Sequence, residues 1–204
     1  MTDAAHRLRL FVSAGPDLGA EQEAIGRGVA RIPVPSLGWA IGRTPRRGEP
    51  QFVAWEEIAA ADLFLLILGR DIRAPVGAEL LAARRAGKRV LAYRKDVRRT
   101  QAAEAFAREA AVEWMAYDVP GQVARLAQIA LVEMVLAQGL PPVERDTLRG
   151  FLEGLRRGEV EAPPVEETGG AGGGGVILVP GKDLPAGGVL VGDEGEPEDE
   201  SNET

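Results

Sequence analysis

The chain has 204 residues, of which 45% are hydrophobic and 27% are charged, a balance typical of a protein that buries a hydrophobic core. It contains no cysteine, which excludes disulfides, thiolate catalysis and cysteine metal sites, and its single histidine, His6, argues against histidine-based metal or triad chemistry. The net charge of −7 is unevenly distributed, because residues 1–157 have 23 basic and 19 acidic side chains (net +4) whereas residues 158–204 have 1 and 12 (net −11).

Apolar runs and periodic patterns predict alternating strands and helices along residues 1–157. Strands are predicted at residues 7–14, 34–41, 63–68, 89–93 and 112–117. Helices are predicted after Asp17, which would be an N-cap, and at residues 52–61, 76–86, 100–110, 120–138 and 142–156. The run LFLLIL at 63–68 is apolar throughout, as expected for a strand that is buried on both faces of a parallel sheet. The alternation predicts an α/β, flavodoxin-like three-layer sandwich with five parallel strands in the order 2-1-3-4-5.

The remaining residues are predicted to form a low-complexity, acidic tail in three parts. Residues 158–175 are rich in Gly and Pro and predict a linker. Residues 176–192 contain two apolar runs around a turn, which predict either a β-hairpin that adds to a sheet edge of this chain or of a partner, or an isolated apolar segment. Residues 193–204 are acidic and are predicted to be disordered. We expect the tail to be a solubilising extension; the alternative is that it folds back onto the mildly basic domain.

No apolar run is long enough to cross a membrane, and the first residues lack the pattern of a secretion signal. We therefore expect a cytoplasmic protein with no membrane partner.

In the predicted strand order, a ligand belongs at the carboxyl ends of the first and third strands. Glu79 lies close to this crevice, in the predicted first turn of a helix within APVGAELLAARRAGKRVLAY. A carboxylate there gains about 0.3–1 kcal/mol from the helix dipole and needs no catalytic role. Alternatively, small neighbours such as Gly77 would let a substrate approach, and Glu79 could stabilise positive charge on a ribose or attack its anomeric carbon. Asp71 is a second candidate for acid–base work, or else a solvated loop acid.

Other residues near the crevice are candidates for ligand binding. Ser13 and Asp17 could hydrogen-bond a ribose or a phosphate, although they also suit a strand end and a helix cap. Arg70 and Arg73 could bind phosphate. The tryptophans are expected to pack in the core or at its rim, and Trp39 is the one best placed to stack on a base. The predicted ligand-binding set is Ser13, Ala14, Gly15, Asp17, Trp39, Gly69, Arg70, Arg73 and Gly77.

The segment 88–99 is the strongest basic cluster, but it lacks interleaved exposed aromatic residues. It therefore predicts a solvated rim rather than a nucleic-acid site. The sequence contains no P-loop, dinucleotide-binding or metal motif, so neither a metal nor a cofactor is expected.

Short motifs over residues 7–137 resemble the superfamily of nucleoside 2-deoxyribosyltransferases and TIR-like domains. Residues 14–16, Ala-Gly-Pro after an apolar strand, are similar to the Tyr-Leu-Ala-Gly-Pro start of the transferases. Seven residues separate Glu79 from Gly87-Lys88, the spacing found between the transferase nucleophile and its Gly-Lys pair. The segment FVSAGPDLGAEQEAI (11–25) resembles the start of an uncharacterised TIR-like family. The transferase tyrosine corresponds here to Val12, and its aspartate to Arg73.

The resemblance implies a domain that binds a nucleotide-like small molecule, with NAD or another nucleotide as ligand or substrate. It implies cleavage or transfer of an N-glycosidic bond, with Glu79 as the key carboxylate. The alternative is a non-catalytic TIR-like sensing or scaffold module that acts through self-association, or through a partner protein that contacts the C-terminal segment.

Overall fold

The computed structural model describes residues 7–34, 38–45, 49–50, 52–137 and 140–158, and the backbone of residues 177–178. Residues 159–175 of the predicted linker, the acidic end and most of the predicted hairpin lie outside these residues.

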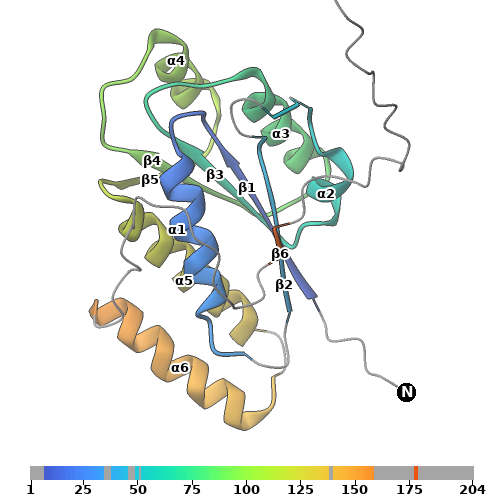
Figure 1. The fold of residues 1–204 in the computed structure, drawn as a ribbon, viewed down its shortest axis with the longest axis vertical. Coiled ribbons are helices and arrows are strands. Elements are labelled where there is room, and N and C mark those ends of the chain that lie inside the picture. The colour runs from blue at the N-terminus through green and yellow to red at the C-terminus, as the bar shows by residue number, and fades with distance from the viewer. Residues whose placement is uncertain are drawn as a thin grey trace, which may run out of the picture.

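The described chain is an α/β fold with a five-stranded parallel sheet, as predicted (Figure 1). The strands are β1 (Arg7–Ala14), β2 (Gly38–Arg43), β3 (Leu63–Leu68), β4 (Val90–Lys95) and β5 (Trp114–Tyr117). The helices are α1 (Gly19–Ala30), α2 (Trp55–Ala60), α3 (Ala74–Arg85), α4 (Gln101–Glu109), α5 (Pro120–Leu136) and α6 (Pro142–Arg157). The strand order is β2-β1-β3-β4-β5, and a two-residue strand, β6 (Ile177–Leu178), pairs in parallel with β2.

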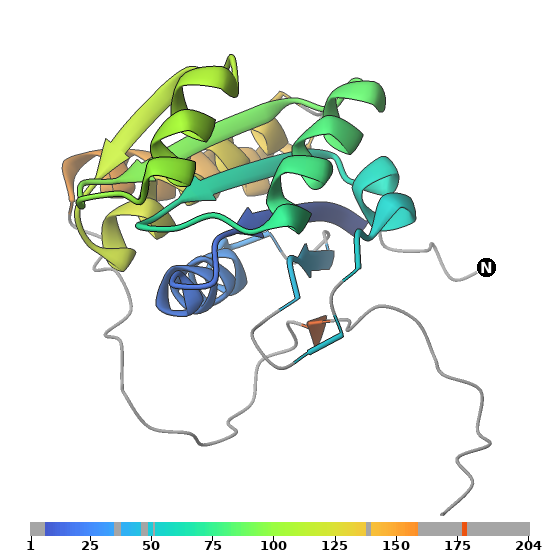
Figure 2. The ribbon, with the colours of Figure 1, turned by 90° about the horizontal axis from the view of Figure 1, so that it is seen from above.

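Two hydrophobic cores lie on the two faces of the sheet. On one face, Leu8, Leu10 and Val12 of β1 pack with residues of α1, α5 and α6. On the other face, Phe11 of β1 packs with residues of α2 and α3. Figure 2 shows α3 and α4 on one side of the sheet and α1 on the other. Because side chains alternate along a strand, Ser13 shares the face of Phe11 and points toward α3.

Helix α3 begins at Ala74, two residues earlier than predicted. Its first turn accepts Pro75, because the missing amide hydrogen of a proline would be unpaired at that position in any case. Glu79 therefore lies in the second turn, and the prediction of a first-turn acid is wrong. Its side chain has no exposed surface, so stabilisation of a solvated helix start does not explain it.

The prediction that Asp17 caps α1 is also wrong. The N-cap of α1 is Leu18, and no side chain caps this helix. Asp17 instead accepts a hydrogen bond of 2.7 Å from the backbone N–H of Arg70, in the loop that follows β3. The carboxylate thus joins the loops after β1 and β3.

Among the described residues, no helix is long and apolar enough to cross a membrane.

Candidate functional site

Three buried polar residues meet at the carboxyl ends of β1 and β2, and we call them the Glu79 cluster. Ser13 is near the end of β1, Thr44 directly follows β2, and Glu79 is in α3. The hydroxyls of Ser13 and Thr44 each donate a hydrogen bond of 2.6 Å to the same oxygen, Oε2 of Glu79. All three side chains are buried, with exposed fractions of 0%, 4% and 0% in chain order. The cluster therefore connects β1, β2 and α3 inside the protein.

Thr44 is the centre of this network, although the sequence did not single it out. Its hydroxyl donates to Glu79 and accepts a hydrogen bond of 3.1 Å from the backbone N–H of Ala14. Its own backbone N–H donates to the carbonyl of Val12 at 3.1 Å, so the pairing of β2 with β1 continues one residue further. The sequence placed the end of this strand at residue 41 and left Thr44 in a loop, which hid its role.

The two oxygens of the Glu79 carboxylate have different surroundings. Oε2 has two hydroxyl donors, whereas Oε1 is buried and has no hydrogen-bond partner in the described part of the chain. Burial raises the pKa of Glu79, and the hydrogen bonds from Ser13 and Thr44 oppose that increase. One oxygen is thus fixed in place while the other is left to accept a proton, a hydrogen bond or a nearby positive charge.

A second set of predicted residues lies where the loop after β1 packs closely against the loop after β3. Gly69 is closely packed, because a Cβ there would collide with the carboxylate of Asp17 and lie 2.8 Å from Leu18 Cδ2. Gly15 is equally restricted, since a Cβ would lie 2.7 Å from the carbonyl oxygen of Asp71. These glycines are therefore required by the close approach of two loops, and this accounts for them without a ligand.

Asp71 makes its side-chain hydrogen bond outside the Glu79 cluster. Its carboxylate accepts a hydrogen bond of 2.9 Å from the hydroxyl of Thr100, at the N-terminus of α4. This bond, together with one from the backbone N–H of Ile72, lowers the pKa of Asp71. A carboxylate with a lowered pKa is a poor proton donor near neutral pH, so acid–base work with Glu79 is not what this geometry favours.

The structure separates the other predicted residues. Trp39 pairs with Leu8 near the start of β1 and packs against the α1-side core, so it lies on the opposite face and toward the opposite end of the sheet from Glu79. Arg70 is exposed and Arg73 is partly buried, on either side of Asp71 at the carboxyl end of β3. Ala14 is buried and contributes its backbone N–H to the Glu79 cluster.

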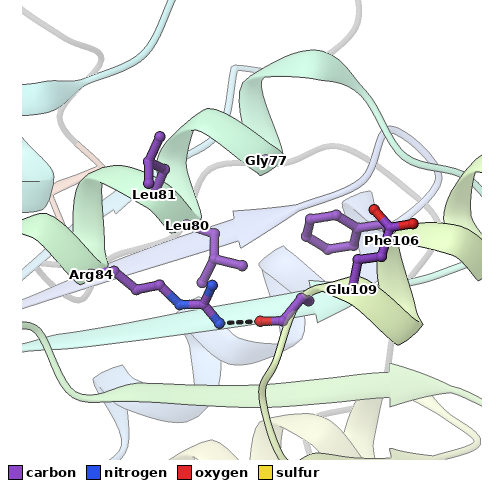
Figure 3. Close-up of a pocket in the computed structure, with 7 residues that line it drawn as sticks. Gly77, Leu80, Leu81, Arg84, Phe106 and Glu109 are labelled. Atoms are coloured by element: carbon purple, nitrogen blue, oxygen red, sulfur yellow. Dashed lines mark hydrogen bonds between the residues drawn. The ribbon is translucent and has the colours of Figure 1, made fainter.

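Gly77 lines a different hollow, of about 230 Å³, between α3 and α4 (Figure 3). The lining residues are Gly77, Leu80, Leu81, Arg84, Phe106, Glu109 and Ala110. The guanidinium of Arg84 donates to the backbone carbonyl of Ala110 across one end of it. Glu79 is not among the lining residues, so this hollow is distinct from the Glu79 cluster.

Among the described residues, no group of three His, Cys, Asp or Glu side chains is placed to hold a metal ion. Comparison of the sequence with models of protein families, and with curated proteins, gives no match.

We expect Thr44→Val to destabilise the protein by about 1–3 kcal/mol, because it leaves the N–H of Ala14 without an acceptor and removes one donor to Glu79. Urea unfolding measures this loss. Thr147→Val is the matched control: Thr147 is exposed on α6 and donates only to the carbonyl of Val143 in its own helix, so its loss should stay within about 0.5 kcal/mol. Equal effects of the two substitutions would contradict this description of the cluster.

We expect Glu79→Gln to stabilise the protein increasingly as the pH rises. Because burial raises the pKa of Glu79, the folded state binds its proton more tightly than the unfolded state does. The resulting stabilisation is present at low pH and is lost as the pH rises from the ordinary value of 4.5 through the raised value.

The Gln amide can accept both hydroxyl hydrogen bonds without a buried charge, so above that range the variant should gain on the order of 1 kcal/mol. Unfolding free energies of the two proteins, measured between about pH 4 and pH 8, give the difference. A variant that is less stable than the natural chain at every pH would show that the ionised carboxylate is structurally required.

Proposed function

We propose that the chain binds a nucleoside or nucleotide at the carboxyl ends of β1, β2 and β3 and acts on its N-glycosidic bond through Glu79. One observation carries the proposal: Oε2 of Glu79 is held by two hydroxyls, while Oε1 is buried and has no partner among the residues that the structure describes. A carboxylate that served only to connect secondary-structure elements would be expected to use both oxygens. A buried acceptor without a donor costs about 1–3 kcal/mol, and such costs are characteristic of functional sites.

The position of the cluster supports a ligand at this edge of the sheet. β1 is paired on one side with β2 and on the other with β3, so the connections leave it in opposite directions. In open parallel sheets, ligands bind outside the carboxyl ends of the strands at such a point. Ser13, Thr44 and the Asp17–Arg70 contact all lie there.

The chemistry of a buried carboxylate suits an N-glycosidic bond. When the bond between the anomeric carbon and the base nitrogen breaks, its electron pair goes to the nitrogen and positive charge develops on the ribose. A carboxylate in a low-dielectric site stabilises that charge strongly, or bonds through Oε1 to the anomeric carbon to form an ester. Water then supplies a hydroxyl to that carbon and a proton to the solvent, which frees the carboxylate.

The raised pKa of Glu79 also favours a particular kind of substrate. Burial favours the neutral acid, whereas a cationic group next to Oε1 favours the carboxylate. NAD carries its positive charge on the nicotinamide ring, directly at the glycosidic bond, and its base leaves as a neutral molecule. NAD is therefore the substrate that best matches a buried carboxylate. Because Glu79 has no exposed surface, the binding of NAD requires displacement of the residues that cover the carboxylate.

We expect the purified chain to hydrolyse NAD or a nucleoside, and Glu79→Gln to lower kcat/KM by at least about a hundredfold, since the nucleophile is lost. Release of the free base, followed by chromatography, measures the rate. Glu153→Gln is the control, because it removes an exposed carboxylate on α6 that pairs with Arg157. Retention of turnover in the Glu79 variant would overturn the assigned role. Absence of both turnover and binding for the whole panel would overturn the proposed function.

A second candidate is a non-catalytic module that works through self-association or a partner protein. Two observations favour it: Glu79 has no exposed surface, and the edge of β2 accepts a further parallel strand at Ala40 and Ile41. In this account the C-terminal segment adds a strand to a sheet edge of the same chain or of a second copy.

For this candidate we expect a chain that ends at Gly158 to lose self-association, while a chain that lacks only residues 193–204 keeps it. Sedimentation velocity at several protein concentrations measures the assembly of both. If both truncated chains assemble like the full chain, residues 159–192 play no part in assembly. If the chain ending at Gly158 also keeps the melting temperature of the full chain, the deleted residues are an appendage that does not stabilise the domain.

A further inference from the structure

A second polar cluster lies at the same edge of the sheet as the Glu79 cluster but toward α1. It consists of Glu21 in the first turn of α1, Lys95 at the end of β4, Tyr117 at the end of β5, and Arg99 in the loop before α4. We call it the Lys95 cluster. Lys95 and Tyr117 are partners in the register of β4 and β5, so their side chains share a face, and Tyr117 belongs to the core on the α1 side.

The backbone and side chains of this cluster are held firmly. The ammonium of Lys95 is 2.8 Å from Oε1 of Glu21, which is itself only 1% exposed. The guanidinium of Arg99 donates to the carbonyl of Lys95, and the N–H of Asp96 donates to the carbonyl of Tyr117 at 2.8 Å. The positions of the cationic groups are therefore fixed before any ligand arrives.

Two donors in the cluster have no acceptor among the described residues. The hydroxyl of Tyr117 and the Nε–H of Arg99 are buried and have no hydrogen-bond partner in the described part of the chain. Burial, together with the nearby charges of Glu21 and Asp17, raises the pKa of Tyr117, so its hydroxyl keeps its proton and stays a donor. Each buried donor without an acceptor lowers the stability of the folded state, and one acceptor that binds both donors would remove both losses.

The weak pairing of Arg99 favours an anion as that acceptor. Glu21 pairs with Lys95, and Asp17 is a further acidic group near Tyr117, whereas the ion pair that the described residues give Arg99 is with Glu104, whose carboxylate lies 3.8 Å away on a half-exposed side chain. An anion can replace so weak a partner. Helix α4 begins directly after Thr100, whose hydroxyl accepts a hydrogen bond from the backbone N–H of Ala103 and so caps the helix. The basic segment 88–99, predicted to be a solvated rim, thus ends in a partly buried cationic site.

The loop that carries Arg99 is also joined to the loop after β3. The backbone N–H of Thr100 donates to the carbonyl of Arg70, and its hydroxyl donates to Asp71, both at 2.9 Å. The loop after β3 in turn contacts Asp17, which follows β1. The two clusters therefore lie at the same edge of the sheet, and the loops between them, which follow β1 and β3 and precede α4, are connected by hydrogen bonds.

We propose that the Lys95 cluster binds a phosphate group, free or carried by a nucleotide, through Lys95, Arg99 and the hydroxyl of Tyr117. Phosphate supplies several acceptor oxygens with negative charge, which match the two unpartnered donors, the Nε–H of Arg99 and the hydroxyl of Tyr117, beside the ammonium of Lys95 that Glu21 holds in place. The phosphate site stands on its own geometry. Its assignment to the phosphate of a nucleotide whose ribose lies at Glu79 rests on the proposed function.

The test is calorimetric titration of the full chain with inorganic pyrophosphate, AMP and adenosine. We expect pyrophosphate to bind, and AMP to bind more tightly than adenosine. Arg99→Gln should lower the affinity for pyrophosphate and for AMP by about tenfold, the usual effect of losing one charge-assisted contact. The affinity for adenosine should be unchanged. Arg98→Gln is the matched control, because Arg98 is an exposed neighbour in the same loop and loses the same charge.

Tyr117→Phe is a second variant that should fold as the natural chain does, since it removes only a hydroxyl that has no hydrogen-bond partner among the described residues. It should weaken pyrophosphate binding severalfold without lowering the melting temperature. Equal losses in Arg98→Gln and Arg99→Gln would overturn the site, because they would indicate unspecific surface attraction. Pyrophosphate affinity unchanged by both Arg99→Gln and Tyr117→Phe would overturn it as well.

The titrations also separate this inference from the proposed function. If pyrophosphate binds in a way that depends on Arg99, while adenosine, AMP and NAD do not bind, the phosphate site is supported and its assignment to a nucleotide is wrong. Binding of adenosine and AMP with equal affinity, and no binding of pyrophosphate, overturns the phosphate site and leaves the proposed function intact.

Discussion

The two hydroxyl hydrogen bonds to a single oxygen of Glu79 are the constraint on which the rest of the site depends. They fix α3 against the ends of β1 and β2, because Ser13, Thr44 and Glu79 come from those three elements. They also make the carboxylate asymmetric, because Oε2 accepts two hydrogen bonds whereas Oε1 accepts none from the described part of the chain. Burial is the largest influence on its pKa and favours the neutral acid, whereas the hydrogen bonds from the two hydroxyls favour the ionised form. Under the proposed function, a ligand that brings positive charge to Oε1 would favour the carboxylate.

Alternation along the strands distributes the chemistry of this edge over both faces of the sheet. Ser13 faces α3 and the Glu79 cluster, whereas Val12, one residue earlier, packs in the core beneath α1. At the ends of β4 and β5, Lys95 and Tyr117 face the α1 side. The edge thus has a carboxylate with two hydroxyls on one face and a set of cationic and phenolic donors on the other, and the two proposals assign these to the ribose and the phosphate of one ligand.

The sequence predicted the architecture well because the fold depends on burial, which hydrophobic patterns record directly. LFLLIL matches β3 at both ends, and the strand order follows from the alternation of strands and helices. The site was only partly predictable, because it depends on backbone pairing that the patterns do not record. β2 ends at Arg43 rather than at residue 41, which brings Thr44 to Glu79, and β4 continues past its apolar run to Lys95. Asp17 illustrates the same limit: its position suits a helix cap, yet its partner, Arg70, lies 53 residues away in sequence.

The most direct test of the central claim is a titration of the Glu79 carboxyl group itself, by ¹³C NMR of selectively labelled protein with Glu79→Gln for assignment. We expect a pKa above the ordinary value of 4.5 in the free protein, because the carboxyl group is buried. We also expect this pKa to fall when NAD or a nucleoside binds, because the ligand places positive charge or a hydrogen-bond donor at Oε1. A Glu79 that titrates at the ordinary value and does not respond to any of these ligands would contradict the account.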